Sequence, residues 1–390
     1  MTQQTRDADD AAVPGGSDAG APVAEPNPDP LTGPDGDAGI EPPPVTPRAV
    51  TLSVATVLTA LLVSGLALLP APYAISSPGP TRDTLGEVGD TALITVDGAE
   101  THESSGELLL TTVSVAGGPA YPASLVDVLR GWADGARSVE PVEAVFAPAQ
   151  SQDAIDAQNQ AAMVSSQENA TVAALEELGY EVPTVLHVAE PVEGTGSWGV
   201  VEPKDIIVSV DGHALESFSD LSARMDEVEP GAVVDLGVLR GGEPVTLEVT
   251  TVESDGRALL GVLVDPEFEL PVDVSIEIEN IGGPSAGTMF ALGIIDTLTP
   301  EDETGGAVIA GTGTMDLAGR VGPIGGIRQK MAGALRDGAT YFLAPEANCD
   351  EVVGHVPNGL QVVSVLTLGD AREAITAIGA GEGGSLPGCD

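Results

Sequence analysis

Two residues of this 390-residue chain, Ser285 and Lys330, have the types and surroundings that nucleophilic catalysis needs. Ser285 follows a Gly-Gly-Pro turn and opens a helix predicted over Ala286–Leu298. A serine hydroxyl there lies beside the free N–H groups and the positive dipole end of a helix, which can stabilise an oxyanion. The same position suits an ordinary N-cap serine. Ser285 alone therefore leaves a nucleophile and a helix cap as alternatives.

Lys330 supplies the second group. Of the 14 basic residues only two, Lys204 and Lys330, are lysines. A helix predicted over Ile327–Arg336 places Lys330 on the same apolar stripe as Ile327 and Met331. Removal from water lowers the pKa of an amine, and a neutral amine can take the proton of a serine, whereas arginine cannot be deprotonated. The alternative is a lysine whose stem covers apolar surface. Together the two residues predict a serine nucleophile with a lysine base.

The elements that must position this pair alternate between strands and helices along residues 271–379. This pattern indicates one compact α/β or α+β domain. Upstream, two short apolar runs predict strands, and an Ala-rich stretch over 150–178 predicts a helix that Gly179 ends. The predicted strands are 92–96, 108–115, 272–279, 307–315, 320–323, 340–344 and 361–365.

A second unit is predicted upstream of the catalytic candidate. A buried strand over 205–212 ends in an Asp–Gly turn, a short helix follows over 218–225, and strands over 233–239 and 245–251 form a hairpin. This order resembles a bacterial PDZ domain, although Lys204 stands where that family usually has Gly. The resemblance implies capture of a peptide as an added strand. The alternative is a small β domain that packs only against its neighbours.

Four segments around Ser285 and Lys330 resemble the proteolytic domain of Lon proteases. They are GPSAG at 283–287, GTGTMDL at 311–317, GRVGPIGGIRQK at 319–330 and PEAN at 345–348. The resemblance implies a Lon-type fold with Ser285 as nucleophile and Lys330 as base. Two positions depart from the family pattern. Gly282 replaces an acidic residue, and Thr314 replaces the Glu of a Thr-Gly-Glu sequence.

The N-terminal region predicts a membrane anchor. Residues 1–48 are rich in Asp, Pro, Gly and Ala and predict a disordered acidic tail. Residues 49–71 begin with 21 uncharged residues, long enough to cross a bilayer. A cleaved signal peptide is the alternative, but the leader before it is long. The flanking charges, Arg48 and Arg82, do not decide the orientation.

The whole layout resembles the membrane-anchored PDZ–Lon-like serine peptidases of Gram-positive bacteria. That resemblance implies a single-pass protein of the cell membrane whose catalytic part lies outside the cell, with self-association as in Lon-like rings. The expected fold class is α+β. The expected segments are the anchor at 49–71, an extracytoplasmic β/helical region at 72–182, a PDZ-like domain at 183–255, a Lon-like domain at 265–380 and a tail at 381–390.

Composition bounds the partners. The net charge of −46 argues against nucleic acid, because phosphates need basic partners. No metal-binding pattern occurs, so neither a metal nor a cofactor is expected. No GxxxxGK[ST] segment occurs, so cleavage is expected to need no ATP. Membrane or secreted polypeptides are the expected substrates. Residues 49–71 are expected to contact membrane lipid. Cys349 and Cys389 either form a disulfide or are two unrelated thiols.

Two other functions fit parts of the sequence. GPSAG also matches the G-x-S-x-G elbow of Ser–His–Asp hydrolases, with His355 as the histidine and Asp316, Asp337 or Asp350 as the acid. That fold needs βα units upstream of the serine, where a PDZ-like unit is predicted instead. A non-catalytic PDZ scaffold with a Lon-like fold is the second alternative, and the presence of both Ser285 and Lys330 argues against it.

Overall fold

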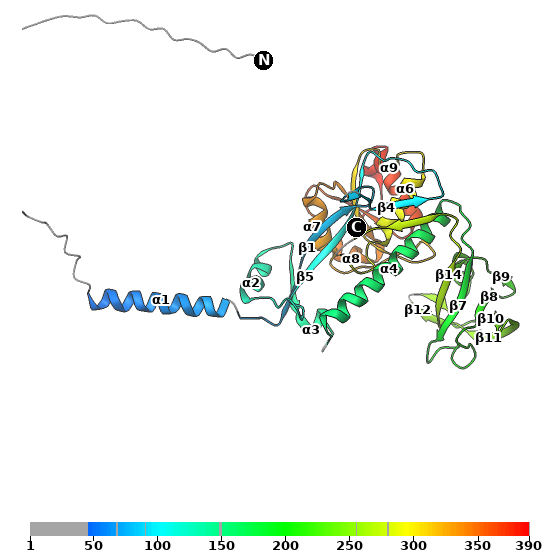
Figure 1. The fold of residues 1–390 in the computed structure, drawn as a ribbon, viewed down its shortest axis with the longest axis horizontal. Coiled ribbons are helices and arrows are strands. Elements are labelled where there is room, and N and C mark those ends of the chain that lie inside the picture. The colour runs from blue at the N-terminus through cyan, green and yellow to red at the C-terminus, as the bar shows by residue number, and fades with distance from the viewer. Residues whose placement is uncertain are drawn as a thin grey trace, which may run out of the picture. The chain divides into compact units, whose positions relative to one another are not determined.

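The computed structural model describes residues 46–67, 69–89, 91–147, 150–254, 256–278 and 281–389. The chain divides into two compact units, Met1–Thr59 and Ala60–Asp390. The tail expected at 1–48 lies outside the described residues except for its last three. The second unit contains the two six-stranded sheets of the structure (Figure 1) and the candidate active site.

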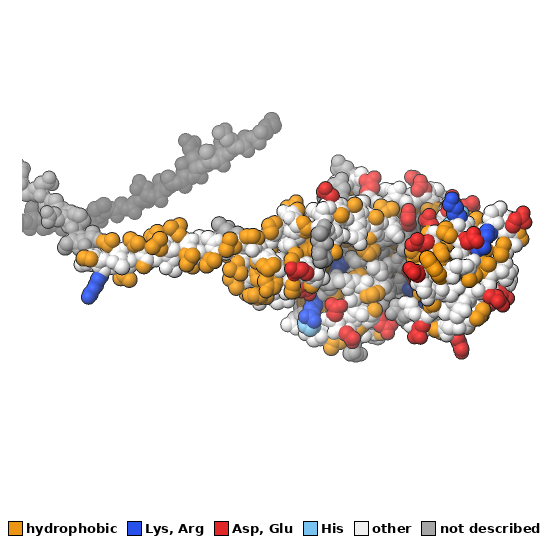
Figure 2. All heavy atoms as spheres, turned by 90° about the horizontal axis from the view of Figure 1, so that it is seen from below, with side chains coloured by type: hydrophobic (Ala, Val, Ile, Leu, Met, Phe, Trp, Pro, Cys, Tyr) orange, Lys and Arg blue, Asp and Glu red, His pale blue; other side chains and the backbone are white. Residues whose placement is uncertain are grey.

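The apolar segment forms one helix, α1, over Pro47–Ala67. It begins two residues earlier than expected, because proline is well suited to the first helical position and Thr46 caps the Ala49 N–H. Most of its side chains are hydrophobic, and none is buried (Figure 2). Among the helices of the described residues, α1 is the one that is long and apolar enough to cross a membrane. Its mean hydropathy is 2.1 over 18 residues.

A six-stranded mixed sheet holds the candidate active site, in the order β20-β19-β16-β5-β1-β6. Strands β5, β16, β19 and β20 run parallel, whereas β1 is antiparallel to β5 and β6. The bounds are β1 Tyr73–Asp83, β5 Glu107–Ala116, β6 Ser138–Pro141, β16 Val308–Gly311, β19 Tyr341–Pro345 and β20 Gln361–Val365.

This sheet crosses the boundary expected between 72–182 and the Lon-like segment. Three of its strands come from residues 73–141, and β5 pairs directly with β16. The physical reason is burial, because Leu108 to Leu110 are almost fully buried on both faces of the sheet and need a partner strand on each side. The upstream segment is therefore part of the same sheet.

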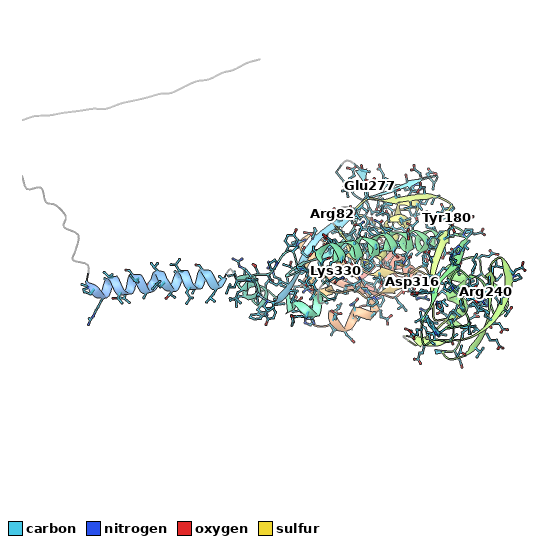
Figure 3. All side chains as sticks on the ribbon, turned by 60° about the horizontal axis from the view of Figure 1, so that its bottom comes forward. Arg82, Tyr180, Arg240, Glu277, Asp316 and Lys330 are labelled. Carbon is cyan, nitrogen blue, oxygen red and sulfur yellow. A yellow bond between two sulfur atoms is a disulfide. The ribbon has the colours of Figure 1, made fainter. Side chains whose placement is uncertain are left out.

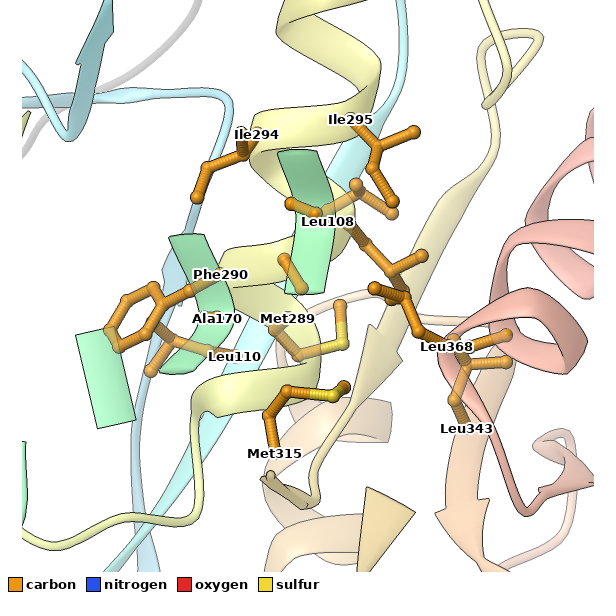
Figure 4. Close-up of a cluster of buried hydrophobic side chains, with 14 of the residues drawn as sticks. Leu108, Leu110, Ala170, Met289, Phe290, Ile294, Ile295, Met315, Leu343 and Leu368 are labelled. Atoms are coloured by element: carbon orange, nitrogen blue, oxygen red, sulfur yellow. The ribbon is translucent and has the colours of Figure 1, made fainter. Parts of the chain in front are cut away.

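Alternate residues along the strands face two separate cores. Leu108, Ile309 and Leu343 join one core with helix α6, whose first ten residues are all buried (Figure 4). Their neighbours Leu109 and Phe342 join a second core with helix α7 on the opposite face. The first face is covered by α4 Gln152–Glu177, α6 Gly287–Leu298 and α9 Leu368–Gly379, and the second by α7 Ile327–Arg336.

The second sheet is built from residues 184–268, in the order β11-β10-β8-β7-β14, with α5 packed into its core. Strand β14 lies beyond the end expected at residue 255, and it pairs with β7. Lys204 has a left-handed backbone with φ 73°, which explains why glycine suits that position. The bounds are β7 Thr184–Pro191, β8 Ile206–Val210, β9 His213–Ala214, α5 Phe218–Asp226, β10 Val233–Arg240, β11 Glu243–Thr250 and β14 Val262–Phe268.

The C-terminal segment packs onto the first sheet and is not a free tail. The Ser364 N–H of β20 donates to the Pro387 carbonyl, and Gln361 donates to the Gly383 carbonyl. A disulfide joins Cys349 to Cys389, which decides between the two alternatives left by the sequence.

The smaller elements connect these layers. Some of the strands predicted from the sequence are shorter or interrupted in the structure, as at β3, β4 and β15. The bounds are β2 Glu87–Val88, β3 Thr91–Ala92, β4 Ile94–Asp97, α2 Leu125–Ala133, α3 Val142–Val145, β12 Val252–Ser254, β13 Arg257–Leu259, β15 Asp273–Ile276, β17 Thr314–Met315, β18 Val321–Gly322 and α8 Cys349–Val352.

Candidate active site

Ser285 lies in the loop that precedes α6. The N-cap of α6 is Ala286, not Ser285, and no side chain caps the helix. The expectation that Ser285 opens the helix is therefore wrong by one residue, because the turn continues through Ala286. The Ser285 hydroxyl has no capping bond to make, and the cap reading of this serine does not hold.

Lys330 reaches this hydroxyl from α7 on the other side of the loop. Its Nζ lies 2.8 Å from Ser285 Oγ. The side chain is 2% exposed, and its other contacts are the Thr111 carbonyl at 2.8 Å and Thr312 Oγ1 at 2.9 Å. None of these three groups is a carboxylate, so burial acts unopposed and lowers the Lys330 pKa to about 7. Figure 3 shows Lys330 within the main body of the second unit.

Two threonines that sequence reasoning did not single out complete the site. Thr111 lies on β5, and its hydroxyl donates to the Gly311 carbonyl of the neighbouring strand. Thr312 follows β16, is fully buried, and donates its hydroxyl proton to the Ser285 carbonyl at 2.9 Å. Thr312 stands inside a segment that resembles Lon. Thr111 acts through its carbonyl, for which the sequence carries no signal.

Helix α4 and the strand β16 region fix the loop that carries Ser285. Asn159 accepts the Gly283 N–H through its carbonyl, and Ser166 donates to the Pro284 carbonyl at 2.9 Å. From the other side, the Gly313 N–H donates to the Ser285 carbonyl at 3.0 Å. The loop that carries Ser285 is thus held at three successive residues before the helix begins.

A cavity of about 250 Å³ opens above the pair. Within the described part of the chain, the Ser285 and Ala286 N–H groups donate to no acceptor. They lie where an oxyanion formed on attack by Ser285 could be stabilised. The lining residues are Pro80, Thr111, Thr112, Val113, Ser114, Met163, Ile281, Gly282, Ser285, Ala286, Gly325 and Lys330.

The geometry does not bring His355 to Ser285. His355 is exposed, and its side-chain hydrogen bond within the described residues goes to the Val353 carbonyl. Asp316 pairs with Arg320, and Asp337 pairs with Arg336. The described residues therefore do not place His355 and an aspartate beside Ser285 as a Ser–His–Asp triad requires.

A second hollow lies in the other sheet, between α5 and β14. Its volume is about 340 Å³. Its apolar lining includes Leu221 and Met225 from α5 and Val262 to Val264 from β14. Strand β14 ends the sheet order, so its outer edge is unpaired among the described residues. An apolar groove beside an open strand edge can accept an extended peptide.

Residues 273–376 match the family model of the Lon protease (S16) C-terminal proteolytic domain. With the geometry above, this match confirms the α+β class and the resemblance to the Lon proteolytic domain, and it supports a serine peptidase. The Lon protease of Clostridioides difficile strain 630 is 37% identical over 117 residues, which cover 28% of this chain and 15% of that protein. Residues 273–376 are therefore similar to a Lon-type proteolytic domain.

A different relative matches a shorter stretch. The periplasmic pH-dependent serine endoprotease DegQ of Escherichia coli K12 is 39% identical over 83 residues, 21% of this chain and 18% of DegQ. Among solved structures, the PDZ domain of an SdrC-like protein from Listeria monocytogenes is 16% identical, with a TM-score of 0.20, and the match covers 20% of this chain and 85% of that one. The chain spans 15% and 18% of the length of these two curated relatives.

Proposed function

We propose that the protein is an ATP-independent, membrane-anchored serine endopeptidase in which Ser285 is the nucleophile and Lys330 the general base. One observation carries the proposal: Lys330 Nζ lies 2.8 Å from Ser285 Oγ. The Lys330 side chain is buried, and its hydrogen-bond partners among the described residues are uncharged. The proposed anchor is α1, the proposed location is the cell membrane with the catalytic part outside, and self-association forms part of the proposal.

The contacts of Lys330 support the base role through their directions. A neutral amine has two N–H groups and one lone pair. The Thr111 carbonyl can only accept, and Thr312 Oγ1 already donates its proton to the Ser285 carbonyl. Both N–H groups of the neutral amine are therefore used by these two acceptors, and the lone pair is left for the Ser285 hydroxyl proton.

The proposed reaction follows from this arrangement. Lys330 Nζ takes the proton as Ser285 Oγ bonds to the scissile carbonyl carbon, and the Ser285 and Ala286 N–H groups bind the oxyanion. The C–N bond breaks and the Lys330 ammonium protonates the leaving amine. Water then attacks the ester, gives its proton to Lys330, and the proton returns to Ser285 as the acid product leaves.

The second sheet supplies a proposed substrate-capture unit. The apolar groove and the open β14 edge fit an extended polypeptide, as in the PDZ domains that this unit resembles. Substrates are proposed to be flexible or unfolded segments of membrane or secreted proteins, since the sequence has no P-loop to drive unfolding.

The test is fragment analysis of casein by mass spectrometry with the full chain in nanodiscs, with ATP removed by apyrase. We expect Ser285→Ala and Lys330→Ala to abolish cleavage. The matched controls are Ser275→Ala and Lys204→Ala, both exposed, which should keep the parental rate. His355→Ala should also be active. Cleavage that survives Ser285→Ala, or that stops without ATP, would refute the proposal, and absence of any cleavage by the parent would favour a scaffold.

A further inference from the structure

Helix α2 carries an apolar face that the protein body does not cover. Leu125, Leu129 and Trp132 follow one another at i, i+4 and i+7, so they form one stripe. They are 39%, 54% and 62% exposed. The adjoining face of the helix, at Val128 and Gly131, is buried.

The helix is firmly built, so the exposure of this face is not the result of a loose segment. Ser124 and Asp127 form a capping box at its start. Gly131 lies so close to Val139 that a Cβ there would meet its Cγ2 at 2.5 Å. Trp132 packs edge-on against Tyr73, with ring centroids 6.0 Å apart. A rigid helix thus presents large apolar side chains outward.

The start of α2 is tied to the residues that leave α1. The Leu125 N–H donates to the Leu69 carbonyl, and the Ala71 N–H donates to the Ala123 carbonyl at 2.8 Å. Leu69 is two residues after Ala67, the last residue of α1. Two residues span at most ~7 Å. The N-terminus of α2 therefore lies close to the end of α1, whatever the direction that α1 takes.

We propose that the apolar face of α2 lies in the headgroup–acyl boundary of a phospholipid bilayer. This inference rests on the proposed anchoring by α1, because a spanning α1 brings the start of α2 to the bilayer surface. Tryptophan and tyrosine prefer that depth, and Tyr121, which shortly precedes α2 in the chain, is 73% exposed. Hydrophobic side chains gather around α2 in Figure 2.

The charged residues of α2 indicate which kind of lipid its apolar face needs for binding. Asp127 and Arg130 are the ionisable residues of α2, and they pair with each other across the side of the helix. The face therefore carries no excess positive charge to select anionic lipid. Zwitterionic phosphatidylcholine should be enough, with the apolar contact as the attraction.

The test uses tryptophan fluorescence of the full chain reconstituted in phosphatidylcholine liposomes brominated near the top of the acyl chains. The chain has two tryptophans, so Trp198→Phe leaves Trp132 as the reporter and Trp132→Phe leaves Trp198. We expect a ~2-fold loss of Trp132 emission in brominated relative to plain lipid, and no loss for Trp198. Adding Leu129→Asp should abolish the loss, whereas Leu366→Asp, whose parent leucine is 53% exposed compared with 54% for Leu129, should preserve it.

Flotation of the liposomes separates the proposed membrane anchoring by α1 from the proposed bilayer contact of α2. Protein that floats while Trp132 is not quenched would overturn the α2 contact and leave the anchor standing. A blue-shifted but unquenched Trp132 would mean that a second copy of the chain covers the face, and equal quenching of Trp198 would mean non-specific adsorption; both overturn the proposal. Protein that does not float would overturn the anchor and the α2 contact together.

Discussion

At the scale of single residues, the chain uses its cations for different purposes. Arginine forms the structural ion pairs, as where Arg240 meets the buried Asp205 at 2.7 Å. Lysine occurs at the one buried position where the amine meets a serine and no carboxylate. Arginine would remain charged there, since its pKa stays above the physiological range. A lysine at 330 therefore fits the proposed role of a base, which must be able to lose its proton.

The Lys330 pKa of about 7 predicts the direction of the pH dependence. The base must be neutral, and the neutral fraction rises as the pH passes upward through that pKa. We expect the logarithm of kcat/KM for a peptide substrate to increase with a slope of one per pH unit below about pH 7 and to level off above it. Lys330→Arg should lose activity by a factor of ~10³ or more at every pH, although the positive charge is kept.

Initial rates between pH 5 and pH 9 measure this profile, with the far-UV spectrum at each pH as the control for folding. A rate that is flat through pH 7 would contradict the assignment of Lys330 as the base. So would appreciable activity of Lys330→Arg.

At this scale the sequence predicts what the motifs carry and no more. Ser285 and Lys330 could be proposed because their types and spacing match a known pattern. Thr312 lay inside that pattern, but its role depends on a hydrogen bond to the Ser285 carbonyl that only the folded loop creates. Thr111 contributes a carbonyl oxygen, and every residue has one, so residue type could not reveal it.

At the scale of elements, a helix with strong hydrophobic periodicity could be predicted from the sequence, whereas an edge strand could not. Helix α7 has the predicted bounds, Ile327–Arg336, because its apolar stripe and the preceding glycines define both ends. Strand β14 was missed because Pro266 and acidic residues interrupt it, which an edge strand tolerates. Helix α9 begins with a capping box at Thr367 and Asp370, a signal that the sequence contained. The pairing of β5 with β16 joins residues about 200 apart, which no local pattern specifies.

The contact between α4 and the loop that carries Ser285 favours a glycine at position 282. A Cβ at Gly282 would lie 2.8 Å from the Asn159 Cβ of α4. We expect Gly282→Ala to lower the free energy of unfolding by ~1–3 kcal/mol and to reduce kcat, because α4 and the loop must separate. An acidic residue at 282 should be worse, since it is larger and charged.

Gly325 provides the matched control, because it lines the same cavity but has nothing within 4 Å of a built Cβ. Gly325→Ala should unfold in urea at nearly the parental midpoint. Equal stability of Gly282→Ala and Gly325→Ala would show that α4 does not restrict the loop.

At the scale of the whole molecule, the two cysteines lock the C-terminus to the catalytic sheet. The disulfide joins Cys349, at the start of α8, to Cys389, and the segment between Gly383 and Pro387 lies along β20. This segment covers an edge strand that would otherwise be open. Disulfides persist in oxidising surroundings, so the pair supports the proposed location outside the cytoplasm.

The disulfide makes the side of the membrane testable in intact cells that express the full chain. A thiol-reactive maleimide that cannot cross the membrane should label neither cysteine at first. After a membrane-impermeant reductant it should label both, because the reductant and the label reach the outer face alone. Cys349→Ser/Cys389→Ser is the control for background. Labelling that requires lysis would place this part of the chain in the cytoplasm. Labelling of intact cells before reduction would place it outside and show that the disulfide is absent there. The same double variant should unfold more easily by ~2–4 kcal/mol and still cleave substrate, because neither cysteine lines the cavity of Ser285 and Lys330.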